Sequence, residues 1–230
     1  MSRRYFTSEL FSFLNDLARH NDRGWFKANQ DRYEEHVREP ALEFITDFGE
    51  RLAAISPNFV ADSRKVGGSL FRIQRDIRFA KDKTPYKTNT GMHFRHVRAK
   101  DAHAPGFYVH LEPRASFAGV GIWGPDSASA TKIRRAIVDD PTGWRKAAYG
   151  KRFSDVYAMD DHGDKLKRPP RGFDPDHRYI EDLKRRHFLG STKLTQARIA
   201  GGGFLDDYTA MCRRAAPFMQ FLCAAVEVPF

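Results

Sequence analysis

Apolar residues in the first quarter of the chain recur at helical spacing. From Thr7 they follow one another three and four positions apart, the period of a helix with one buried face, and Thr7 or Ser8 can cap its start. A second apolar stripe runs through residues 23–37, and Pro40 suits the first turn of a third helix. The pattern therefore predicts an all-helical beginning.

The period changes to that of a strand in the middle of the chain. Apolar and polar residues alternate over residues 72–79, although Arg75 interrupts the apolar side. Turn residues separate three further short segments of this kind, at residues 91–97, 106–112 and 116–123. Four such strands in succession predict an antiparallel meander.

Helical spacing returns in the second half of the chain. It predicts helices that begin near Pro125 and at Pro141, and a longer amphipathic helix over residues 204–226. Between them, a stretch rich in proline and charge predicts a long loop at residues 160–178, and residues 187–194 predict one more strand.

These elements predict a single α+β domain over residues 1–230. Residues 1–56 form its helical lobe, residues 66–124 its strand-rich core, and residues 125–230 a mainly helical part that contains the long loop. We expect the sheet to be antiparallel, with the C-terminal helices packed on one of its faces.

Size and composition remove the need for covalent staples. Of the 230 residues 41% are hydrophobic, and 19 are Phe, enough to bury a core without disulfides or a structural metal. Cys212 and Cys223 lie eleven positions apart in one predicted helix, roughly 16 Å along its axis, and cannot pair. Free cysteines, with no signal-peptide core and no membrane-length apolar run, predict a cytoplasmic protein. We also expect no cofactor.

The positive charge is concentrated in one segment. The formal charge is +10, and residues 64–100 hold 11 basic and 2 acidic residues, whereas the rest of the chain holds 28 and 27. A local excess of this kind predicts an anion site more than a uniformly basic surface.

The predicted strand at residues 72–79 and the turn after it carry the candidate ligand-binding cations. On a strand, Asp76 would lie between two guanidinium groups and hold both, and a guanidinium held in this way offers two parallel donors to a phosphate or carboxylate. Tyr86 can supply a hydroxyl. The alternative is that the same charges form a network that stabilises the fold. The candidate cations are Arg72, Arg75, Arg78, Lys83 and Lys87.

The same segment resembles a known family. The pattern Arg72-x-x-Arg75-Asp76-x-Arg78-Phe79-x-x-x-Lys83-x-x-Tyr86 is similar to the signature of the domain-of-unknown-function 2461 family. Stretches that extend the resemblance over almost the whole chain lie at Asn21 with Trp25-Phe26, at residues 106–111 and at residues 217–222. The resemblance implies one intact α+β domain and a shared site, but it brings no reaction or catalytic residue.

A second polar group lies on the predicted strand at residues 106–112. Tyr108, His110 and Glu112 alternate with apolar residues and share one face, so His110 and Glu112 form a candidate acid–base pair. The candidate catalytic residues are Asp76, which would orient the arginines, and Tyr86 and His110, either of which could transfer a proton. We expect no metal site, because His93 and His96 would point to opposite faces of a strand.

Three functions remain open at this point. The first is a site that binds or acts on a small phosphate- or carboxylate-bearing ligand through the basic cluster. The second is a nucleic-acid-binding module, in which Phe71, Phe79, Tyr86 and Phe94 would stack on bases. The third is a structural or interaction protein in which the arginines and Asp76 hold the fold together.

Overall fold

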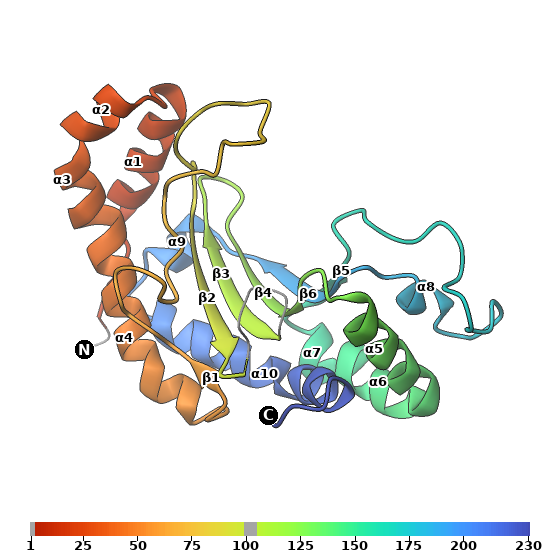
Figure 1. Ribbon diagram of the computed structural model, residues 1–230. Coiled ribbons are helices and arrows are strands. Elements are labelled where there is room, and N and C mark those ends of the chain that lie inside the picture. The colour runs from red at the N-terminus through yellow and green to blue at the C-terminus, as the bar shows by residue number, and fades with distance from the viewer. Residues whose placement is uncertain (1–2, 99–104) are drawn as a thin grey trace.

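The computed structural model describes residues 3–98 and 105–230. In the view of Figure 1, helices α1–α4 lie to the left of the central sheet, α5–α8 lie to its right, and α10 runs below it. The elements in chain order are α1 (Ser8–Arg19), α2 (Arg23–Ala28), α3 (Gln30–Tyr33), the π-helix η1 (Glu34–Arg38), α4 (Glu39–Ala53), β1 (Phe59–Val60), β2 (Thr90–His96), β3 (Gly106–Leu111), β4 (Phe117–Ile122), α5 (Ser127–Asp139), α6 (Pro141–Tyr149), α7 (Lys151–Ser154), β5 (Ala158–Asp160), α8 (Ile180–Leu183), β6 (Phe188–Lys193), α9 (Gln196–Ile199) and α10 (Phe204–Ala225).

The sheet is antiparallel and has six strands in the order β1-β2-β3-β4-β6-β5. Strands β2, β3 and β4 form the predicted meander, and the predicted strand near the C-terminus joins it as β6. The α+β class, with helices at both ends of the chain, is therefore confirmed.

Helices α4 and α10 cover one face of the sheet. Phe94 of β2 lies with its ring 4.7 Å from that of Phe48 in α4 and 6.0 Å from that of Tyr208 in α10. Phe107 and Val109 of β3 alternate onto the same side and are fully buried. We call the opposite side of the sheet the open face. Gly91 and His93 of β2 and Tyr108 and His110 of β3 lie on it.

The helical lobe follows its sequence signals, with one local break. Thr7 caps α1, as predicted, by accepting from the backbone N–H of Glu9. The single helix predicted for residues 23–37 is divided into α2, α3 and η1. The division lies at Asn29, whose backbone leaves helical geometry (φ −116°, ψ 18°) while its side chain donates to the carbonyl of Trp25. Such side-chain to backbone bonds compete with the helical ladder.

The strand predicted for residues 72–79 is wrong. Residues 61–89 form a loop. An isolated bridge of Leu70 with Met92 joins it to β2, and a second bridge, Gln74 with Tyr86, joins two parts of the loop itself. The apolar residues of this segment do not share one buried face: Ile73 is buried, whereas Phe79 is 95% exposed. We call residues 72–87 the basic loop; in Figure 1 it stands beside α1.

The cysteines and the helix lengths agree with the sequence. Cys212 and Cys223 are both buried in α10 and unpaired, as their spacing predicted. Within residues 3–98 and 105–230, no helix is long and apolar enough to cross a membrane.

Candidate functional site

Glycines hollow the open face of the sheet. Gly91, Gly106, Gly119 and Gly121 all lie on this face of β2, β3 and β4. A side chain on Gly106 would bring a Cβ within 2.3 Å of the His93 ring. A Cβ on Gly91 would come equally close to the Tyr108 hydroxyl. These glycines therefore let rings from the neighbouring strand lie flat on the sheet, the use of a strand glycine where another group approaches closely.

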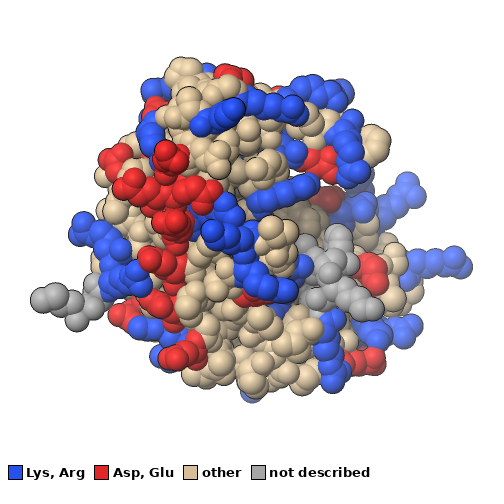
Figure 2. Space-filling view, turned by 60° about the vertical axis from the view of Figure 1, so that its left-hand side comes forward, with Lys and Arg blue, Asp and Glu red and all other residues tan. Residues whose placement is uncertain are grey.

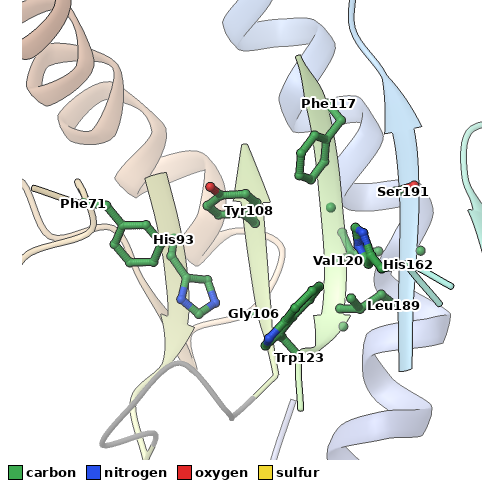
Figure 3. A pocket seen from close by; sticks show the side chains of 13 residues that line it. Phe71, His93, Gly106, Tyr108, Phe117, Val120, Trp123, His162, Leu189 and Ser191 are labelled. Carbon is green, nitrogen blue, oxygen red and sulfur yellow. The ribbon is translucent and has the colours of Figure 1, made fainter. Parts of the chain in front are cut away.

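The hollow is a cavity of about 380 Å³. Its wall is predominantly apolar, and it combines side chains from four strands with Phe71, Trp123 and His162 from the segments between strands (Figure 3). The strands β2, β3, β4 and β6 supply the floor, whereas Phe71 and His162 enter from the loops after β1 and β5. The side chains that shape it are Phe71, His93, Tyr108, Phe117, Trp123, His162, Leu189 and Ser191.

His93 is a buried polar side chain in the wall of the cavity. Only 9% of it is exposed, and its Nδ1 atom has no hydrogen-bond partner among the residues that the structure describes. Burial, with the nearby charge of Arg95, lowers the pKa of His93 to about 4. At neutral pH the cavity wall therefore holds a neutral imidazole, and its Nδ1 atom is buried.

Tyr108, His110 and Glu112 form a hydrogen-bonded chain along β3. The Tyr108 hydroxyl lies 3.0 Å from His110 Nδ1, and His110 Nε2 lies 3.0 Å from Glu112 Oε2. Burial and the charge of Glu112 raise the pKa of Tyr108 well above its usual value. The His110 ring stacks on Phe117 at 4.8 Å, and Ser116 closes the turn after β3 by bonding the backbone of Glu112. His110 and Glu112, which the sequence places on one strand face, are thus in hydrogen-bond contact, and Tyr108 extends this chain into the wall of the cavity.

A cluster of aromatic rings forms the far wall of the cavity. Trp123 stacks on His187 at 4.2 Å, and the His162 ring meets Trp123 at 4.8 Å. Ser191 donates to Asp160 at 2.7 Å, which fixes its hydroxyl on the side of β5. This wall is therefore flat and mainly aromatic, with its polar atoms already engaged at the edges.

Lys87 lies at the rim, against Phe71. The backbone N–H of Phe71 donates to the carbonyl of Gly91 and so holds this end of the basic loop to β2. Lys87 Nζ is 5.6 Å from the centre of the Phe71 ring and donates to the carbonyl of Arg72. Burial and the charge of Arg72 lower the pKa of Lys87.

The other predicted cations lie along the exposed loop. Arg78 pairs with Asp76 at 2.6 Å, and their side chains are 76% and 45% exposed. Hydrogen bonds from Arg78 lower the pKa of Asp76 to about 2. Arg75 pairs with Asp82 and bonds Thr84, while Lys83 donates to the carbonyl of Ile77. Most of these charges are therefore engaged locally instead of facing one ligand.

On the face shown in Figure 2, Lys and Arg side chains are spread widely, and a band of acidic side chains runs among them.

Tyr86 anchors the basic loop to the helical lobe. Its ring stacks on Phe26 at 4.1 Å, and the side-chain amide of Asn21 bonds both its backbone N–H and its carbonyl. Of the three candidate catalytic residues, His110 joins the cavity through Tyr108, whereas Asp76 and Tyr86 belong to the basic loop.

Sequence reasoning missed most of the cavity wall. The sequence indicates Phe71 only as a ring that could stack on a base, and His93 only as a possible metal ligand. No local pattern marks Trp123, His162 or Ser191 as part of a site. The signal that was available is the alternation of glycine with aromatic residues or histidine, in Gly91-x-His93 and Gly106-x-Tyr108-x-His110. Among the described residues, no group of three or more His, Cys, Asp or Glu is arranged to hold a metal ion.

Comparison with known proteins identifies one family. The model of a family described as "Conserved hypothetical protein (DUF2461)" matches residues 9–221. No curated protein and no solved structure matches the chain. The matched range includes the basic loop, the cavity and the chain of Tyr108, His110 and Glu112.

Proposed function

The chain belongs to the DUF2461 family of conserved hypothetical proteins, and because membership assigns no reaction, we propose from the site itself that it binds a small anionic ligand with a planar ring. The ring would occupy the cavity on the open face. Its phosphate or carboxylate group would lie at the rim beside Lys87 and Arg72.

The observation that carries this proposal is the aromatic cavity that contains an unpartnered His93. A cavity of about 380 Å³ lies within the size range of small-molecule sites. Rings on opposite walls, Phe71 on one side and Trp123 on the other, favour a flat apolar body. The His93 ring adds a neutral polar side chain to the same wall, and its buried Nδ1 atom lacks a partner among the described residues.

The anionic group is supported by the two cations at the rim. Lys87 is partly buried and lies close enough to Arg72 for the two like charges to repel each other. Neither forms an ion pair with a described acidic side chain, although the charge of Arg72 helps to lower the pKa of Asp76. An anion placed between them offsets both the repulsion and the burial of Lys87.

Thermal-shift titrations with matched ligand pairs test the proposal. Each pair is an aromatic carboxylate or phosphate ester and its neutral amide or alcohol. A ligand at 100 times its Kd stabilises by about 2.7 kcal/mol, a rise of a few degrees in Tm for a chain of this size. We expect the anionic member of a pair to give the larger shift and to change the fluorescence of Trp123.

Two substitutions locate the ligand. Lys87→Met should weaken binding of the anionic ligand of each pair by about tenfold, the equivalent of one weak charge-assisted hydrogen bond. Binding of the neutral ligand should not change. Lys146→Met, at an exposed position of α6, is the matched control. Gly119→Leu fills the floor, where a Cβ meets only ordinary contacts, and should abolish both shifts. Shifts that survive Gly119→Leu would show that the cavity is not the site.

One observation favours a second candidate, the binding of single-stranded nucleic acid by the basic loop. Phe79 is 95% exposed, with the Arg78 guanidinium 6.0 Å from its ring. The other rings considered for stacking are engaged elsewhere: Phe94 is buried, Tyr86 stacks on Phe26, and Phe71 lines the cavity. Phe79→Ala should then weaken oligonucleotide binding and Gly119→Leu should not, with a log K against log salt slope of several units.

A further inference from the structure

We propose that the cavity is an acid–base site, in which Tyr108 takes a proton from the bound ligand and passes its own proton to His110. This inference rests on the proposed function, because the ligand must first occupy the cavity. It adds a reaction class, proton abstraction, and a substrate class, planar molecules with an acidic C–H beside a carbonyl group or a ring heteroatom.

The directions of the hydrogen bonds follow from the groups themselves. An ionised Glu112 can only accept, so His110 carries its proton on Nε2 and donates it across the 3.0 Å contact. Nδ1 of His110 is then an acceptor, and the Tyr108 hydroxyl donates its single proton to it, also at 3.0 Å. The lone pairs of Tyr108 Oη remain available as acceptors for a donor on a ligand.

The placement of Tyr108 suits this role. Its ring lies over Gly91 and forms part of the cavity wall, and Phe71 and Phe117 lie 5.9 and 5.8 Å from it. Apolar neighbours strengthen hydrogen bonds and exclude water from the transfer. Because burial holds the pKa of Tyr108 high, the phenol stays protonated at rest, and its proton must leave as the ligand's proton arrives.

The step balances without a cofactor or a redox partner. The C–H proton of the ligand moves to Tyr108 Oη, and the phenol proton moves to His110 Nδ1. The electron pair of the broken C–H bond stays on the ligand, which becomes an anion near Lys87. The imidazolium that forms on His110 is stabilised by the Glu112 carboxylate. Glu112 is therefore a positioning residue, and Tyr108 is the catalytic one.

Nitrobenzisoxazole is a suitable probe because it is planar and reports proton abstraction directly. A base removes its ring C–H proton, the freed electron pair completes a nitrile, and the N–O bond breaks to release a coloured nitrophenolate. We expect the wild-type protein to accelerate this reaction. Binding of the probe is measured separately by the fluorescence of Trp123, which lines the cavity.

Variants separate the roles within the chain of three residues. Tyr108→Phe keeps the ring and should leave the Kd of the probe unchanged, while the rate at saturation falls by about 100-fold, the usual contribution of one general base. Tyr157→Phe, which removes a buried hydroxyl without a partner in the core, is the matched control and should keep the wild-type rate.

Glu112→Gln tests the relay, since a structural role would not alter the isotope effect. It should lower the rate less than Tyr108→Phe. It should also reduce the solvent deuterium isotope effect on the rate, because the phenol proton then no longer moves together with the ligand's proton.

The outcomes distinguish this inference from the binding proposal. If the probe binds but reacts no faster with the wild type than with Tyr108→Phe, the acid–base role is overturned and ligand binding stands. If neither the probe nor any aromatic anion binds, both proposals are overturned together.

Discussion

The basic loop and the open face of the sheet show two different uses of polar residues. The loop carries much of the chain's excess charge, yet Arg75 and Arg78 pair with Asp82 and Asp76 a few positions away, on the surface. The open face carries few charges, yet it brings His93, Tyr108 and Ser191 to one cavity from three strands. Density of charge along a sequence therefore does not by itself make a site; convergence of side chains from separate elements does.

The largest effect is expected where a charge pair is buried instead of exposed. Asp182 accepts hydrogen bonds from Trp144, Tyr149 and Arg185, and the side chains of Asp182 and Arg185 are 4% and 8% exposed. Asp182→Ala leaves the guanidinium buried without its partner and should lower the free energy of unfolding by about 3–5 kcal/mol. Urea denaturation measures this loss; one below about 1 kcal/mol would contradict the contrast between buried and exposed pairs.

The second effect concerns His93 and depends on pH. Its pKa is about 4 in the folded protein and 6.5 in a model peptide, so the unfolded chain takes up the proton first as the pH falls. The stability due to neutral His93 is present above pH 6.5 and is lost towards pH 4, by up to about 3 kcal/mol. His93→Gln removes this titration. The difference in unfolding free energy between wild type and variant should therefore change between pH 7.5 and pH 4.5; an unchanged difference would contradict it.

The third effect compares two glycines of the open face. Gly106→Ala drives a Cβ into the His93 ring and should cost about 1–3 kcal/mol, the usual penalty of overpacking. Gly119→Ala meets nothing closer than 3.6 Å and should change stability by less than about 0.5 kcal/mol. Equal effects in thermal denaturation would mean that the glycines serve the strand backbone and not the rings above them.

The smallest effect is expected in the basic loop. Asp76→Asn removes an ion pair between two exposed side chains, and exposed pairs contribute little to stability. We expect no change in Tm beyond measurement error. A large fall would support the alternative in which the arginines and Asp76 hold the fold together.

Much of the fold could be predicted from local patterns. The cap at Thr7, the helix from Pro141 to Tyr149 and the meander all have signals contained within a few residues. The prediction of a strand at residues 72–79 is wrong for the same reason. Alternation is a local pattern, whereas a strand also needs a neighbouring strand to share hydrogen bonds with. Beside β2, pairing comes instead from β1 and from the single isolated bridge of Leu70 with Met92.

The candidate site could be predicted only in part. His110 and Glu112 are two positions apart on one strand, so their pairing follows from strand geometry alone. The contact of Phe71 with Tyr108, or of Trp123 with His187, joins residues far apart in the chain, and no periodicity carries that information.

The sequence by itself determined the helices, the central meander, the unpaired cysteines and the family, because each depends on spacing within a short stretch. Only the tertiary structure decided which charges pair with each other and which polar groups share a cavity. The physical reason is that strand register sets these distances. In this protein the register places a ring over Gly91 and another over Gly106, and so builds the cavity between them.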